Sequence, residues 1–168
     1  SLEGGVSTVI EGLSGNDFGR PYTGGDFSVA NDGAIAFTSG DSQRPSDIHV
    51  LRQGRRTQLT RLNADYLGAK TLGAVQKIEV ASSFDGRIIE SWLTLPAGYV
   101  EGRSYPLILE IHGGPFAAYG PHFATDNQLF AAAGYAVLSV NPRGSTSYGE
   151  EFANLIHHDY PSHDHAEI

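Results

Sequence analysis

Hydrophobic and polar positions alternate over short stretches in the first 76 residues, a pattern that predicts strands joined by turns. Asn31-Asp32-Gly33 and Gln53-Gly54 are turn signals, and residues 40–46 are expected to form a loop. Such closely spaced strands predict an up-and-down sheet like one blade of a β-propeller, although a β-sandwich has a similar spacing. The predicted strands are residues 5–10, 26–30, 34–38, 47–51 and 56–60.

Beyond residue 76 the apolar runs become longer. Residues 76–83 and 87–95 flank Asp85-Gly86, and together they predict a β-hairpin at the edge of a second sheet. Residues 105–111 form a nearly continuous apolar run, which predicts a strand buried on both faces, and residues 136–140 predict a second buried strand.

A helix is predicted between these two strands, over residues 123–133, with Gly134 at its end. A strand, a helix and a strand in close succession predict a βαβ unit with parallel strands. Residues 150–157 predict a further short helix, and Ser162 is a candidate cap for another. The residues expected on the buried face of the first helix are Phe123, Phe130 and Ala133.

Composition narrows the classes of function. Hydrophobic residues make up 40% of the 168 residues, and the net charge is -8 with a pI near 5.2. An acidic chain disfavours nucleic-acid binding, which needs basic patches. No apolar run is long enough to predict a membrane span. The lack of cysteine excludes disulfides and leaves the compartment undetermined, with the cytoplasm as the favoured expectation. Because the chain lacks Met and starts at Ser1, it is predicted to be part of a longer protein.

The strongest chemical signal is the turn His112-Gly113-Gly114-Pro115, which directly follows the apolar run. Two glycines allow the backbone to approach a substrate carbonyl, and their N–H groups can stabilise a developing negative charge. In lipase- and esterase-type hydrolases a glycine-rich loop after a central strand forms part of the oxyanion hole. Gly113 and Gly114 are therefore the candidate oxyanion donors, with an ordinary Gly-Pro loop as the alternative. His112 is expected to hold the loop by a hydrogen bond rather than to act as the general base.

A second candidate segment, residues 141–149, follows the second predicted parallel strand, at the strand end where ligands gather in open α/β sheets. Arg143 is expected either to bind a substrate carboxylate or to brace this loop, and bracing is favoured. Tyr148 has the same two candidate roles. Neither Ser145 nor Ser147 has glycine at both the −2 and the +2 position, as a nucleophile of this type requires, and no Gly-x-Ser-x-Gly motif occurs in the chain.

Histidines are concentrated near the end of the chain. Residues 157–165 contain four histidines and two aspartates, side chains that suit zinc. Their spacing matches no recognised metal motif, so a solvated polar loop is the favoured interpretation. No metal and no cofactor are expected.

Residues 105–115 and 133–149 together resemble the prolyl oligopeptidase family of serine peptidases, most of all its acylaminoacyl-peptidase branch. The stretches 26–33, 45–50 and 59–63 resemble the last propeller blades of that family, and residues 78–86 resemble its crossing into the hydrolase domain. The resemblance implies a mixed fold. Residues 1–76 would be the last blade or blades of an all-β propeller, and residues 77–168 would be the incomplete N-terminal portion of an α/β-hydrolase catalytic domain.

The resemblance also implies a function. Members of the family hydrolyse short peptides through an acyl-enzyme intermediate, with a Ser-His-Asp triad that would lie outside these residues. Gly114 corresponds to the family's backbone oxyanion donor, with Gly113 beside it. The dipeptidyl-peptidase branch has Tyr where His112 stands, which disfavours that branch.

Two other functions remain open at this point. His-Gly-Gly turns also serve carboxylesterase-type acyl hydrolases, and the chain alone could be an inactive fragment or a binding module. The expected partners are a short peptide substrate and the remainder of the propeller and hydrolase domain, without nucleic acid or membrane. A homo-oligomer is a further alternative. The 168 residues alone are expected to be inactive, because they lack the triad.

Overall fold

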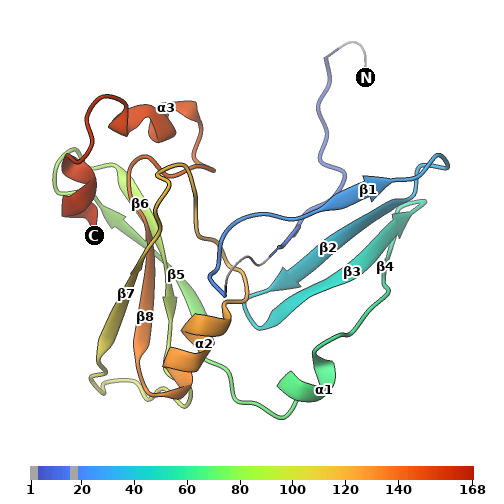
Figure 1. The fold of residues 1–168 in the computed structure, drawn as a ribbon, viewed down its shortest axis with the longest axis horizontal. Coiled ribbons are helices and arrows are strands. Elements are labelled where there is room, and N and C mark those ends of the chain that lie inside the picture. Colours follow the sequence, from blue (N-terminus) through green and yellow to red (C-terminus); the bar gives the residue numbers. More distant parts are fainter. Residues whose placement is uncertain (1–3, 16–18) are drawn as a thin grey trace.

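The computed structural model describes residues 4–15 and 19–168. In these residues the chain forms two four-stranded sheets that lie side by side (Figure 1). The connection between the sheets carries the one-turn helix α1 (Ala64–Leu67). Among the described helices, none combines the length and the apolarity needed to cross a membrane.

The first sheet is an up-and-down antiparallel sheet, as the sequence pattern predicts. Its strands follow one another in the order β1-β2-β3-β4, and every neighbouring pair is antiparallel. The turn between β3 and β4 is Gln53-Gly54, and both residues have positive φ (50° and 74°), as a two-residue hairpin turn of type I′ requires. The strands are β1 (Phe27–Val29), β2 (Ile35–Asp41), β3 (Arg44–Arg52) and β4 (Arg55–Gln58).

Two predictions for this half are wrong. Residues 40–46 do not form a loop, because Asp41 pairs with Arg44 and the strands turn over only two residues. The Asp41 carboxylate tightens that turn by accepting the backbone N–H of Gln43 at 2.8 Å. Residues 5–10 form no strand, and Val6 is 99% exposed, because this stretch has no neighbouring strand to complete a ladder of hydrogen bonds.

The second sheet combines the predicted hairpin with the predicted βαβ unit. The order is β5-β6-β8-β7; the pairs β5-β6 and β6-β8 are antiparallel, and β7 is parallel to β8. Helix α2 (Thr125–Ala132) makes the crossover between the two parallel strands. The strands are β5 (Val75–Ala81), β6 (Ile88–Thr94), β7 (Leu107–Ile111) and β8 (Ala136–Asn141).

The prediction that β7 is buried on both faces is wrong. Leu107, Leu109 and Ile111 are 57%, 39% and 47% exposed. The reason is topological, because β7 lies at the edge of the sheet and pairs only with β8. An apolar run shows that a strand is compatible with burial on both faces, but it does not show whether other elements cover those faces. In this structure the face of β7 that carries Leu107, Leu109 and Ile111 is exposed.

Helix α2 is present, but the prediction of its buried face is confirmed only for Phe123, which precedes the helix and is 7% exposed, and is wrong for the other two residues. Asn127, Gln128 and Ala131 are buried, whereas Ala133 is exposed and Phe130 is only half-buried. The side chains of Asn127 and Gln128 face inward because they form hydrogen bonds there with the Ser139 hydroxyl and with backbone groups. Gln128 accepts the N–H of Gly73 at 2.7 Å and donates to its carbonyl at 3.0 Å.

The C-terminal helices are shorter than expected. The predicted helix over residues 150–157 is one α-helical turn, α3 (Glu150–Ala153), followed by a 3-10 turn, η1 (Asn154–Ile156). A second 3-10 helix, η2 (His163–Glu167), follows Ser162. The Ser162 hydroxyl does not cap that helix, because it bonds to Asp159 at 2.8 Å instead.

Candidate active site

The glycine turn lies directly after the carboxyl end of β7, and its main-chain donors face outward. Gly113 and Gly114 are exposed, and within the described residues neither backbone N–H donates a hydrogen bond to another group of the chain. A Cβ built on Gly113 would meet no atom within 4 Å. Gly114 has a φ of 132°, a conformation that L side chains rarely adopt. The turn thus presents two unpaired amides to open space, which is the arrangement an oxyanion hole needs.

His112 connects this turn to the loop that follows β8. The ring is buried, and its Nε2 lies 2.9 Å from the Oγ of Ser145. The Ser145 hydroxyl donates its only proton to the carbonyl of Pro142 at 2.6 Å, so Ser145 Oγ must accept the bond from His112. His112 therefore carries its proton on Nε2. Burial lowers the pKa of the ring and favours this neutral form.

We expect the stability of this connection to depend on pH. The pKa of His112 is lowered in the folded state, so the unfolded chain binds a proton more readily. The stabilising contribution is complete above the ordinary histidine pKa of about 6.5 and declines as the pH falls below it. The thermal midpoint should therefore drop on acidification, and it should drop less in His112→Gln, which keeps an amide donor but cannot titrate. His122, whose pKa burial also lowers, remains in both proteins as a common background. Equal acid sensitivity of the two proteins would contradict this assignment.

Asn141, at the last position of β8, fixes the segment that follows the glycine turn. Its Oδ1 accepts the backbone N–H of Tyr119, and its Nδ2 donates to the Tyr119 carbonyl, both at 2.8 Å. The indole N–H of Trp92 also donates to this carbonyl, at 3.2 Å. Asn141 and Tyr119 are both fully buried, so these bonds are shielded from water.

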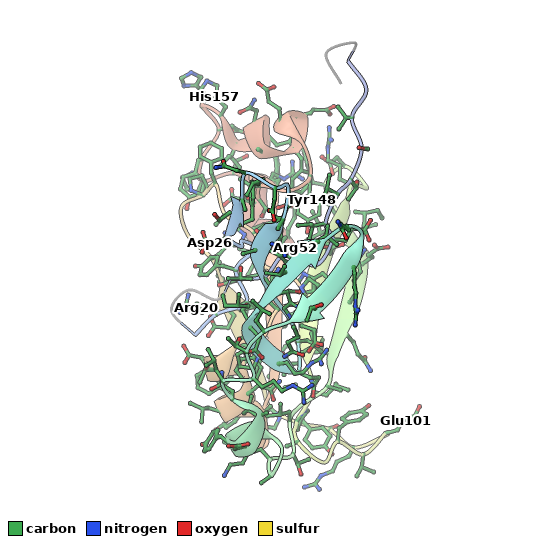
Figure 2. All side chains as sticks on the ribbon, turned by 90° about the vertical axis from the view of Figure 1, so that its right-hand side faces the viewer. Arg20, Asp26, Arg52, Glu101, Tyr148 and His157 are labelled. Atoms are coloured by element: carbon green, nitrogen blue, oxygen red, sulfur yellow. The ribbon has the colours of Figure 1, made fainter. Side chains whose placement is uncertain are left out.

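Tyr148, labelled in Figure 2, extends this network toward the hairpin. Its hydroxyl accepts from Asn141 at 2.7 Å and donates to the Glu90 carboxylate at 2.7 Å. Burial, and the bond to Glu90, raise the pKa of Tyr148. The other oxygen of Glu90 pairs with Lys77 at 2.6 Å. Because both hydrogen-bonding roles of the hydroxyl are used internally, the geometry supports bracing rather than substrate binding.

Arg143 joins three separate segments. Its backbone N–H and its Nε donate to Glu167 at 2.8 and 2.9 Å, and its Nη2 also contacts that carboxylate. The same Nη2 lies 3.3 Å from Asp85, and the guanidinium lies over the ring of Phe84. The hydrogen bond to Glu167 raises the pKa of Arg143. Only 5% of the Arg143 side chain and 1% of the Glu167 side chain are exposed, so this buried pair supports the bracing role.

The histidines near the end of the chain do not converge on a common point. In the part of the chain that the structure describes, no three His, Cys, Asp or Glu side chains are placed to hold a metal ion. His157 lies at the periphery of the molecule (Figure 2), and its ring contacts that of His158. His163 stacks on Phe84 instead. The zinc alternative therefore has no geometric support.

Sequence reasoning missed three residues of this network, namely Asn141, Glu90 and Glu167. Only Asn141 had a usable signal, because it is a polar residue at the carboxyl end of a buried strand. Glu90 and Glu167 lie 58 and 24 residues from their partners Tyr148 and Arg143, so no local pattern connects them.

Comparisons with known proteins place these features in a family. The model described as "Prolyl oligopeptidase family" matches residues 121–168. The chain is 39% identical over 126 residues to the uncharacterized peptidase YuxL of Bacillus subtilis (strain 168). The aligned region covers 74% of this chain and 19% of YuxL. The chain is also 42% identical over 94 residues to dipeptidyl aminopeptidase BIII of Pseudoxanthomonas mexicana. That aligned region covers 52% of this chain and 14% of the relative. The chain spans less than a fifth of the length of these relatives.

The chain also resembles solved structures of acylaminoacyl peptidases. Pyrococcus horikoshii acylaminoacyl peptidase superposes with a TM-score of 0.74 at 27% identity, over 84% of this chain and 22% of that one. An acylaminoacyl peptidase in complex with Z-Gly-Gly-Phe-chloromethyl ketone superposes with a TM-score of 0.67 at 29% identity, over 76% of this chain and 20% of that one. The resemblance to the prolyl oligopeptidase family and to acylaminoacyl peptidases is confirmed. A dipeptidyl aminopeptidase is also among the relatives, and the expectation from His112 that disfavours the dipeptidyl-peptidase branch stays a prediction.

Proposed function

We propose that this chain, a relative of the prolyl oligopeptidase family, supplies the oxyanion-binding turn of a serine peptidase that acts on short peptides. The observation that carries the proposal is the pair of unpaired amides at Gly113 and Gly114, held at the carboxyl end of a parallel strand. Ligands of open α/β sheets bind outside this end of the strands. The intact protein is proposed to be an acylaminoacyl-peptidase or a related oligopeptidase.

The proposed domain division follows the two sheets. Residues 1–76 would be the last blade or blades of a propeller, and a four-stranded up-and-down antiparallel sheet supports this assignment. Residues 77–168 would begin the α/β-hydrolase domain, supported by the antiparallel hairpin and the βαβ unit. The open edge of β7 would accept the next parallel strand of that domain.

In the proposed mechanism, a serine supplied by another part of the intact protein attacks the carbonyl carbon of the scissile peptide bond. The carbonyl oxygen becomes an oxyanion, and the N–H groups of Gly113 and Gly114 stabilise it in the tetrahedral intermediate. The intermediate collapses with cleavage of the C–N bond, and the amine leaves with the proton that the serine hydroxyl gave up to the base of the triad, which also lies outside these residues; water then hydrolyses the acyl-enzyme to the free acid and the serine. His112, Asn141 and Arg143 take no part in proton transfer, because their polar atoms are committed to holding the loops in place.

A fluorophosphonate probe tests the proposal directly. The 168-residue chain should not be labelled, because it contains no Gly-x-Ser-x-Gly motif, whereas the full-length protein should be labelled at a single serine. The full-length protein should also cleave N-acyl peptides or unblocked dipeptide derivatives more efficiently than p-nitrophenyl esters. A clear preference for esters would identify a carboxylesterase instead, and covalent labelling of the 168-residue chain would refute the proposed division of roles.

A further inference from the structure

A short segment from the first half of the chain runs along the segment that follows the glycine turn. Residues 19–23 pair antiparallel with residues 118–120, through a bridge between Tyr22 and Tyr119. The N–H of Thr23 donates to the carbonyl of Ala118, and the N–H of Gly120 donates to the carbonyl of Pro21, each at 2.8 Å. We refer to residues 19–23 as the strap.

Side chains continue this contact toward the glycine turn. The ring of Tyr22 lies 5.0 Å from that of Tyr119, and the ring of Tyr119 lies 5.1 Å from that of His112 in an edge-on arrangement. Both spacings are those of favourable aromatic pairs. His112 is the first residue of the turn, so an unbroken series of three rings links the strap to the oxyanion donors.

Two further contacts hold the strap in position. The carbonyl of Gly19 accepts the N–H of Asp126 in the first turn of α2, at 3.1 Å. Gly19 has a φ of 76°, which L side chains rarely adopt, and a Cβ there would lie 2.8 Å from the Asp126 carboxylate, which would have to shift. Arg20, labelled in Figure 2, forms an ion pair with Glu110 of β7, two residues before His112, with 3.4 Å between Nε and Oε2. The strap therefore contacts the strand before the turn, the segment after it and the crossover helix.

We propose that the strap is a positioning element for the oxyanion turn, and that Tyr22 is its main positioning residue. This inference rests on the proposed function. Asn141 fixes the backbone of Tyr119 from within the second sheet, and the strap adds two main-chain hydrogen bonds to the same segment from the side of the first sheet. Loss of the Tyr22 ring would let Tyr119 and His112 shift, and donors that shift by a fraction of an ångström lose much of their effect on the transition state.

The test uses the full-length protein with Tyr22→Ala, Tyr22→Phe and a control, Tyr66→Ala. Tyr66 is 68% exposed on α1, and its ring contacts Lys70 rather than Tyr22 or Tyr119, so its replacement removes a tyrosine ring and leaves the series of three rings intact. Tyr22→Ala should lower kcat about tenfold with KM changed less than about twofold, because the donors act in the transition state rather than in substrate binding. Tyr22→Phe keeps the ring and should restore kcat to within about twofold of the parent, and Tyr66→Ala should match the parent.

A second measurement separates this inference from the proposed function. Amide hydrogen exchange of the substrate-free protein should become about tenfold faster at the hydrogen-bonded amides of Tyr119 and Gly120 in Tyr22→Ala and remain unchanged in Tyr66→Ala. If the protein proves not to be a peptidase, this local loosening still tests the strap. Unchanged exchange and unchanged kcat in Tyr22→Ala would overturn the inference. A uniform rise in exchange over the whole chain would also overturn it, because it would show a general loss of stability.

Discussion

Alanine at position 114 is expected to lower kcat/KM of the full-length protein for the proposed peptide hydrolysis about 100-fold. The backbone of Gly114 has a φ of 132°, which a residue with a Cβ tolerates poorly. A Cβ there would also lie 3.1 Å from the backbone nitrogen of Phe116. The chain should respond by rotating the peptide groups on either side, and this rotation would turn the amide of Gly114 away from the oxyanion. Steady-state kinetics with an N-acyl peptide would measure the loss, which should appear mainly in kcat.

Gly102→Ala is the matched control for this substitution. Gly102 also has a positive φ, 80°, and a Cβ there would meet no atom within 4 Å. It lies in an exposed turn between β6 and β7, so the substitution also places a Cβ at positive φ, but no candidate donor is involved. Gly102→Ala should lower the melting temperature slightly and leave kcat/KM within about twofold of the parent. If Gly114→Ala retained full activity at a normal melting temperature, Gly114 would not be an oxyanion donor.

The features that could be predicted from the sequence are those decided by local geometry. Gln53-Gly54 predicts a hairpin turn because two adjacent residues must adopt positive φ, and the structure has this turn. The hairpin around Asp85-Gly86 and the βαβ unit are likewise present, because periodicity and connection length determine them. The glycine turn could be located for the same reason, since a strand followed by two glycines is a local signal.

The features that could not be predicted depend on which groups meet across the fold. Helix α2 buries Gln128 because the backbone of Gly73 needs both a donor and an acceptor there, and no pattern within the helix reveals that need. The exposure of Leu109 follows from the edge position of β7, which is a property of the strand order. The partners of Arg143 and Tyr148 come from distant turns and helices, so their bracing geometry became visible only in three dimensions.

Arg143→Ala is expected to lower the free energy of unfolding by about 3 kcal/mol, the largest stability effect we predict. The substitution would leave the Glu167 carboxylate buried, with 1% of its side chain exposed and no cation beside it. It would also remove the bond from Nη2 to Ser82 and the contact with Asp85, so the hairpin turn would lose its connection to the loop after β8. Thermal and urea denaturation of the parent and the variant would measure the loss.

Two companion variants show whether the loss comes from the unpaired buried charge. The double variant Arg143→Met/Glu167→Met removes both charges and should recover most of the stability, because replacing a buried ion pair with apolar side chains is often nearly neutral. Arg52→Ala breaks an exposed ion pair with Asp32, whose side chains are 65% and 56% exposed, and should cost less than about 1 kcal/mol. Equal losses in Arg143→Ala and Arg52→Ala would show that Arg143 does not brace the loop. Recovery of stability in the double variant without recovery of kcat would show that the charged pair also sets the geometry of the loop beside the oxyanion turn.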